Sequence, residues 1–169
     1  MNKENIKNLI KKSLKILIKK DDGLIKKKVR EECINHRLAC HFEYLLSSEK
    51  KYKNHNVDLE YNKNYDSPKK TITDEKKKNV KAIRPDIIIH KRDNNEHNMI
   101  AFEIKKEYTN KWDRFKLEKL LEYPYKYRYG GLISYLPDKD YFIVKLLSKQ
   151  NEKTIEYKFK IKKDKIKSS

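Results

Sequence analysis

A chain of 169 residues is long enough for one domain with a buried core, and its short periodic hydrophobic runs exclude global disorder. The formal net charge of +18 at pH 7 favours a polyanionic partner such as nucleic acid, although biased coding toward Lys, Asn and Ile would produce a similar composition. An anionic membrane surface is a third option. No run approaches a transmembrane span, and we expect no signal peptide.

The first part of the chain predicts two helices. Residues 4–20 place apolar side chains at helical spacing between lysines, which indicates a basic amphipathic helix. Asp21-Asp22-Gly23 interrupts this pattern, so we expect an N-terminal helical segment, 1–22, ahead of one domain that covers 23–163. A longer helix is predicted from about Leu24 to Leu46.

The two cysteines, Cys33 and Cys40, lie seven positions apart in the second predicted helix. Seven residues of helix rise by about 10 Å, which exceeds the Cα separation of about 7 Å that a disulfide tolerates. We therefore expect free buried thiols in a reducing compartment, and so a cytoplasmic location.

The remaining elements predict an α/β fold with a central mixed sheet flanked by helices, plus the extra N-terminal helix. An Asp- and Asn-rich turn at 92–98 indicates a hairpin, and Pro124 ends a predicted helix that begins at Trp112. The polar segment 62–81 is expected to form a mobile loop, and 164–169 a frayed tail. Strands are predicted at 57–61, 87–89, 99–104, 130–135, 141–144 and 154–161.

Three ionisable residues are expected to meet at one end of this sheet. Asp86 opens the first strand of the hairpin, whereas Glu103 and Lys105 close the second and share one face because side chains alternate along a strand. Two neighbouring carboxylates repel each other, and a divalent cation such as Mg²⁺ relieves this repulsion. Such an ion acidifies a bound water and stabilises charge on a phosphate, while Lys105 orients or deprotonates the water or neutralises the developing charge.

The string Pro85-Asp86, a spacer and then Glu103-Ile104-Lys105 resembles the PD-(D/E)XK motif of the restriction-endonuclease-like superfamily. The resemblance covers about residues 29–136. Within the superfamily, the chain is similar to small stand-alone prokaryotic members. It implies a restriction-endonuclease-like fold, in which Asp86, Glu103 and the main-chain carbonyl of Ile104 hold Mg²⁺, with Mn²⁺ as a substitute. Lys105 would then be the catalytic lysine.

Members of this superfamily often add a Glu from the first core helix. Glu31 is our choice because it precedes Ile34 and Leu38 on the apolar stripe, and Glu32 is the alternative. An acid near the start of a helix is also a common structural feature, because the helix dipole stabilises it there. Glu60 and the five histidines are interpreted as structural residues.

Several basic residues are candidates for contacts with nucleic acid. Lys81, Arg84 and Lys106 flank the predicted site, and Lys126 and Arg128 alternate with tyrosines in the run 123–129. A solvated basic face and ordinary loop packing are the alternatives.

The resemblance implies that the protein is an enzyme, a Mg²⁺-dependent phosphodiesterase that acts on nucleic acid as a nuclease or endonuclease. DNA is the expected substrate, and no membrane partner is expected. A homodimer is left open. The main alternative is a catalytically inactive nuclease-fold module that binds nucleic acid or assembles a complex. Membrane association through helix 4–20, or docking of a partner by the same helix, are further alternatives.

Overall fold

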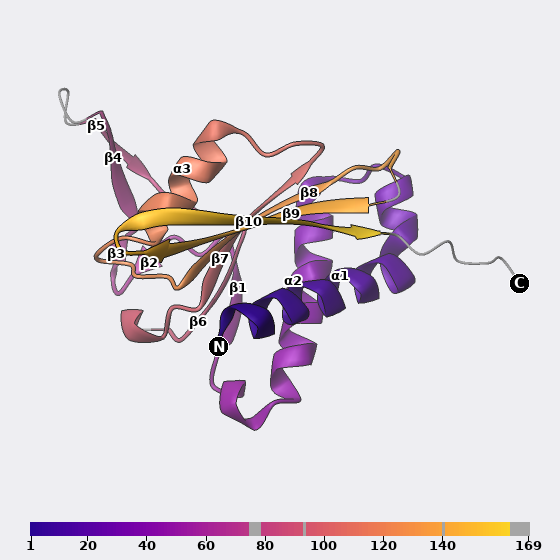
Figure 1. The fold of residues 1–169 in the computed structure, drawn as a ribbon, viewed down its shortest axis with the longest axis horizontal. Helices are drawn as coiled ribbons and strands as arrows, with labels where there is room; N and C mark the ends of the chain where they lie inside the picture. The colour runs from indigo at the N-terminus through magenta and orange to yellow at the C-terminus, as the bar shows by residue number, and fades with distance from the viewer. Residues whose placement is uncertain (75–78, 93, 140, 163–169) are drawn as a thin grey trace, which may run out of the picture.

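The computed structural model describes residues 1–74, 79–92, 94–139 and 141–162. Its main elements are three α-helices and a mixed six-stranded sheet (Figure 1). The helices are α1 (Lys3–Lys26), α2 (Glu31–Ser47) and α3 (Lys111–Leu120). The sheet contains β1 (Asn56–Leu59), β6 (Ile87–His90), β7 (Ile100–Lys106), β8 (Tyr129–Tyr135), β9 (Tyr141–Gln150) and β10 (Lys153–Lys162).

The strands lie in the order β1-β6-β7-β8-β9-β10. Only β7 and β8 pair in parallel, with α3 as the connection between them, and the other neighbours in this sheet are antiparallel. The prediction of a central mixed sheet in an α/β protein is therefore confirmed. The parallel pair brings the carboxyl end of β7 next to the carboxyl end of β8.

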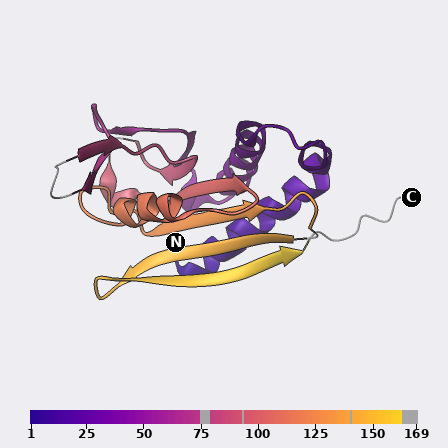
Figure 2. The same ribbon diagram turned by 90° about the horizontal axis from the view of Figure 1, so that it is seen from above.

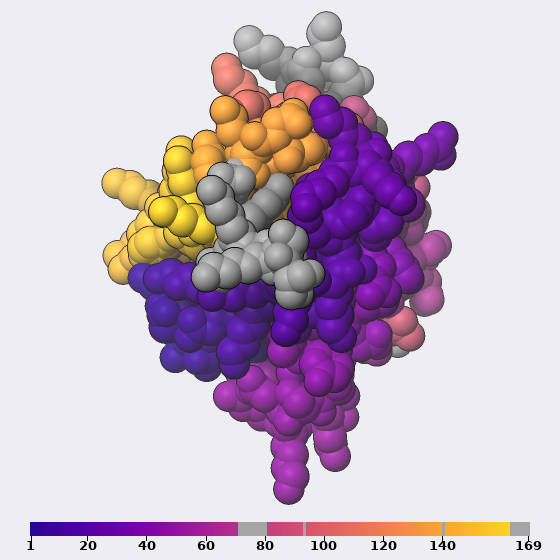
Figure 3. All heavy atoms as spheres, turned by 90° about the vertical axis from the view of Figure 1, so that its right-hand side faces the viewer, coloured from indigo at the N-terminus to yellow at the C-terminus, as the bar shows by residue number. Residues whose placement is uncertain are grey.

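The helices divide between the two faces of the sheet because alternate strand residues point to opposite sides. Ile87, Phe102 and Ile104 pack in one core with α1 and α2, and the ring of Phe102 stacks on that of Phe42. Ile88 and Ala101 face the other way, into a smaller core with α3. Figure 3 shows the first part of the chain, in indigo to magenta, covering one side of the molecule.

Helix α1 is continuous through Asp21-Asp22-Gly23, so the predicted break there is wrong and the boundary at 22/23 falls inside a helix. The physical reason is tertiary: Asp21 Oδ2 bonds His41 Nε2 at 2.7 Å, and its Oδ1 accepts from Arg37 Nε at 2.9 Å. Ile25 is also buried beyond the glycine. These contacts with α2 outweigh the local turn signal, and α2 consequently begins at Glu31 instead of Leu24.

The apolar stripe of α1 packs inside the main core. Eight residues of the helix are buried, and the helix lies against the β9–β10 hairpin (Figure 2). Lys3 Nζ lies 3.9 Å from the ring centroid of Tyr157 in β10. Helix α1 is therefore part of the same hydrophobic core as α2. This packing disfavours the use of its apolar face for a membrane or for a partner protein.

The segment 62–81, predicted as a mobile loop, contains two small hairpins, so that prediction is corrected for its described residues. They are β2 (Lys63–Asn64) with β3 (Ser67–Pro68), and β4 (Lys70–Asp74) with β5 (Asn79–Ala82). The Tyr125 hydroxyl anchors the β4–β5 hairpin by accepting from Lys70 N at 2.6 Å and donating to Lys70 O at 2.7 Å. Residues 75–78 lie outside the described part of the chain, as does the tail predicted at 164–169.

Other boundaries differ in smaller ways. Helix α3 ends at Leu120, ahead of Pro124, and β9 and β10 are each longer than predicted because they pair along their whole length. Both cysteines are free as expected, but Cys33 is exposed and Cys40 half-buried, so the expectation of buried thiols is wrong. Within the described residues, no helix combines the length and apolarity needed to cross a membrane.

Candidate active site

The register of the β6–β7 hairpin brings Asp86 against the end of β7. Ile87 pairs with Phe102, and the Asp86 N–H donates to the Phe102 carbonyl at 3.0 Å. The Asp86 Oδ2 in turn accepts the N–H of Ile104 at 2.6 Å. The predicted meeting of Asp86 with the Glu103–Lys105 segment is therefore present, and a main-chain hydrogen bond holds the Asp86 carboxylate in place.

Lys105 is the centre of a small ionic cluster. Its Nζ lies 3.3 Å from Glu31 Oε2 and 3.9 Å from Asp86 Oδ2. Glu31 is the first residue of α2, and its Oε1 also accepts the main-chain N–H of Lys106 at 2.8 Å. Of the two helix acids considered, Glu31 thus contacts the cluster, whereas Glu32 is exposed.

Glu103 occupies a different environment on the α3 side of the sheet. Its side chain is fully buried, its Oε2 lies 2.5 Å from Lys116 Nζ, and its Oε1 has no hydrogen-bond partner among the described residues. Burial, assisted by the negative charge of Asp86, raises the pKa of Glu103 to about 8. A buried carboxylate with one free oxygen is poorly stabilised, so this group gains from a cation.

The charge states at neutral pH follow from the neighbours of each group. Burial also raises the pKa of Asp86, although the Ile104 N–H and Lys105 act against this shift. Burial lowers the pKa of Lys105, but the carboxylates of Asp86 and Glu31 more than compensate, and the net shift is upward. Lys105 is therefore a stable ammonium ion, suited to orienting water or neutralising charge, and unsuited to acting as a base.

Lys116 is a residue that the sequence analysis did not identify. It lies on the buried side of α3, one position before Leu117 and three after Asp113, whose Oδ1 is 3.9 Å from its Nζ. The helical spacing of Asp113, Leu117 and Leu120 was the available signal, because it marks the face of α3 that packs on the sheet. Tyr135 was missed as well. Its hydroxyl is buried without a described partner, and its pKa is raised mainly by burial and secondly by the negative charge of Glu31.

The donor set fits a hard divalent cation. Asp86, Glu103 and Glu31 offer carboxylate oxygens, which Mg²⁺ prefers, and the unpaired Glu103 Oε1 is a buried acceptor that needs a partner. Ile104 contributes only main-chain atoms, because its side chain lies in the core. Among the described residues, no group of three or more His, Cys, Asp or Glu is already arranged as a metal site. The ammonium groups of Lys105 and Lys116 currently neutralise these carboxylates.

The predicted nucleic-acid contacts divide into two groups. Lys106 follows Lys105 directly, and Arg84 lies two residues before Asp86, with its Nη1 3.4 Å from Glu60 Oε2. Lys81 Nζ lies 4.6 Å from the ring centroid of Trp112, at the start of α3. All three residues are exposed or half-exposed. Lys106 and Arg84 are close to the site along the chain, and Lys81 is connected to it through α3.

Lys126 and Arg128, which were predicted as nucleic-acid contacts apart from the three flanking residues, lie away from the site. They precede Tyr129, which pairs with Ile100 at the start of β7, whereas Lys105 pairs with Ser134. The five residue-to-residue steps from Tyr129 to Ser134 span roughly 17 Å of strand. The tyrosine-rich loop therefore lies at the other end of the parallel pair.

No family model, no curated protein and no solved structure matches this chain. Its function is therefore inferred from the residues of the site.

Proposed function

We propose that this chain is a Mg²⁺-dependent nuclease with a restriction-endonuclease-like fold, and that it hydrolyses phosphodiester bonds in DNA. The observation that carries the proposal is the convergence of Asp86, Glu103 and Lys105 at one end of the β6–β7 hairpin, joined by Glu31 from α2. The order α2, β1, β6–β7, α3, β8 supports it, because this is the order that the PD-(D/E)XK resemblance implies.

The proposed roles follow from the geometry. Asp86 and Glu103 would hold the cation, with Ile104 supplying its carbonyl and Glu31 an outer carboxylate. Bound there, Mg²⁺ would polarise the phosphate and acidify a water molecule. The Lys105 ammonium, held between Asp86 and Glu31, would orient the attacking water and neutralise negative charge as it grows on the phosphate oxygens.

The charge of the protein supports nucleic acid as substrate. A formal net charge of +18 attracts a polyanion and makes binding sensitive to salt, because each neutralised phosphate releases counterions. Arg84, Lys106 and Lys81 are the proposed phosphate contacts near the site. Lys126 and Arg128, at the far end of β8, would contact a nucleic acid only beyond the scissile position.

One observation favours the alternative of an inactive nuclease-fold module that binds nucleic acid. Lys116 Nζ already occupies one oxygen of Glu103 at 2.5 Å, so a cation must displace or share this contact. An inactive module would bind nucleic acid with the same salt dependence and would cut none. Cleavage in the presence of Mg²⁺ separates the two.

The direct test is digestion of plasmid, linear, branched and single-stranded DNA, and of RNA, with and without Mg²⁺ or Mn²⁺. We expect cleavage by the wild type that EDTA abolishes. Asp86→Ala and Lys105→Ala should abolish cutting, and Lys15→Ala, an exposed position on α1, is the matched control. A wild type that cuts nothing with any divalent ion, or an Asp86→Ala variant that cuts equally well, would overturn the proposal.

A further inference from the structure

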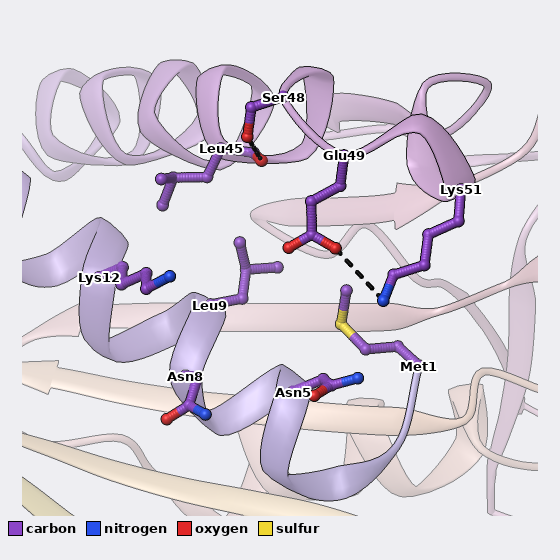
Figure 4. A pocket seen from close by; sticks show the side chains of 9 residues that line it. All are labelled: Met1, Asn5, Asn8, Leu9, Lys12, Leu45, Ser48, Glu49 and Lys51. Atoms are coloured by element: carbon purple, nitrogen blue, oxygen red, sulfur yellow. Dashed lines mark hydrogen bonds and ion pairs between the residues drawn. The ribbon is translucent and has the colours of Figure 1, made fainter.

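A cleft of about 360 Å³ opens beside Asp86, between α2 and the end of β1. Six residues line it: Glu32, Asn35, His36, Leu59, Glu60 and Asp86. A second pocket, of about 180 Å³, lies between α1 and the end of α2 and includes Asn8, Leu9 and Leu45 (Figure 4).

Asn35 distinguishes the first cleft. Its side chain is 6% exposed, and its Oδ1 has no hydrogen-bond partner among the described residues. An unpaired buried amide oxygen is unfavourable and rare in folded proteins, because it has lost its water without gaining a donor. A molecule that enters the cleft and presents an N–H group to Asn35 would remove this deficit.

The remaining lining limits the chemistry of the occupant. Glu32, Glu60 and Asp86 contribute carboxyl groups, so a phosphate or another anion would be repelled. The same groups accept hydrogen bonds, as the Asn35 oxygen does. Leu59 adds an apolar wall and is 37% exposed in the absence of an occupant. A flat group with apolar faces and N–H donors at its edge satisfies these conditions.

We propose that this cleft receives a nucleobase with an exocyclic amino group, which is adenine, cytosine or guanine, from the strand that is cut next to Asp86. The inference rests on the proposed nuclease function and specifies its substrate. Asn35 pairs with adenine through the amino group, and a carboxylate accepts from the amino group of each of these bases. Thymine lacks an exocyclic amino group, and its one N–H donor lies between two carbonyl oxygens that these acceptors repel. A base that leaves the stack to enter a pocket is a known way of reading a nucleotide near a reaction centre.

Binding can be measured without any cleavage. The probes are adenosine, cytidine, guanosine and thymidine, added without divalent metal to ¹⁵N- and methyl-labelled protein, and the signals followed are the Asn35 side-chain amide and the Leu59 methyls. We expect adenosine, cytidine and guanosine to shift both signals at concentrations at least about tenfold below those that thymidine needs. Asn35→Ala should lose this preference, and Asn8→Ala, in the other pocket, should keep it.

The Asn35→Ala variant is expected to fold, because it removes a polar group that has no partner to leave behind. Equal shifts by all four nucleosides, or no shift by any of them, would overturn the proposal.

The source of the base is tested on a DNA library with randomised positions around the cut. Wild type should favour A, C or G at one position by about tenfold over T, and Asn35→Ala should level this preference. If nucleosides bind but Asn35→Ala has the same cleavage preference as wild type, the cleft is a site for free nucleosides. That result would overturn the proposal that the base belongs to the cut strand. A wild type that cuts no DNA but shows base-selective shifts would instead refute the nuclease function alone.

Discussion

Lys116 in α3 places its Nζ 2.5 Å from Oε2 of Glu103 in β7, so an ammonium ion stands beside the carboxylate proposed to bind the metal. The contact spans the connection from β7 to β8 and fixes α3 over the site. A metal ion at the proposed site would therefore compete with the Lys116 ammonium group for the buried Glu103 carboxylate. The first prediction tests this competition.

Lys116→Met is expected to lower the melting temperature at pH 8.5 in the absence of divalent metal, because it leaves the Glu103 carboxylate buried without a counter-charge. Loss of one partner of a buried pair typically costs about 3–5 kcal/mol, and protonation of Glu103 will reduce this cost. Adding Mg²⁺ should restore part of the lost stability. Thermal melts of both proteins, with MgCl₂ and with EDTA, measure this, and an identical Mg²⁺ response in the two proteins would contradict it.

Stability is expected to fall as the pH rises from about 4.5 to about 8. Burial raises the pKa of Glu103 to about 8, against an ordinary value of 4.5, so the folded state keeps a proton that the unfolded state has released. The extra stability is fully present below pH 4.5 and is lost as the pH approaches 8. Urea unfolding at several pH values measures the trend, with Glu103→Gln as the reference that lacks this proton. Parallel pH profiles for the two proteins would refute this account of Glu103.

Mg²⁺ affinity should rise with pH across the same region, because the metal and the proton compete for Glu103. Calorimetric titration at pH 6.5 and pH 8.5 should show tighter binding at the higher value and proton release at the lower one. An affinity that does not change between these pH values would exclude Glu103 as a ligand.

Glu31→Gln is expected to reduce cleavage by about 10- to 100-fold, the usual effect of removing a group that orients a metal site. The amide retains the size of the side chain and can still accept from Lys106 N–H, but it no longer provides a charge for Lys105. Glu43→Gln, on an exposed position of α2, is the control. Initial rates under single-turnover conditions should separate the variants, and equal rates would assign Glu31 a purely structural role.

Two glycine substitutions should have opposite effects on stability. Gly23→Ala should stabilise the protein by about 0.5–1 kcal/mol, because α1 continues through this position and a Cβ there meets nothing within 4 Å. Gly131→Ala should destabilise it by about 1–3 kcal/mol, since its Cβ would overlap the Phe102 ring beside Glu103. Chemical denaturation measures both. A destabilised Gly23→Ala protein would indicate that the helix breaks there after all.

Local patterns in the sequence were sufficient for the hairpin and its ionisable residues. The turn residues at 92–98 and the apolar runs beside them specify two antiparallel strands, and strand alternation then places Glu103 and Lys105 on one face. Glu31 could be chosen over Glu32 from the apolar stripe of the helix. Each of these inferences uses residues that are close in sequence or follow a simple periodicity.

Long-range contacts explain what the sequence analysis missed. The break expected at Asp21-Asp22-Gly23 does not occur, since His41 and Arg37, 20 and 16 residues away, bind Asp21. Lys116 was overlooked because its contact with Glu103 depends on how α3 lies over the sheet. The distance of Lys126 and Arg128 from the site follows from the parallel pairing of β8 with β7, which the sequence does not show.

The sequence by itself therefore determined that two acids and a lysine lie at the end of a hairpin in a basic α/β protein, because short periodic patterns control the direction of each side chain. Only the tertiary structure decided that Lys116 neutralises Glu103, that Asn35 is left without a partner in a cleft beside Asp86, and that α1 belongs to the core. These features depend on burial and on pairing between distant segments, and the free energies that select them arise only when the elements pack together.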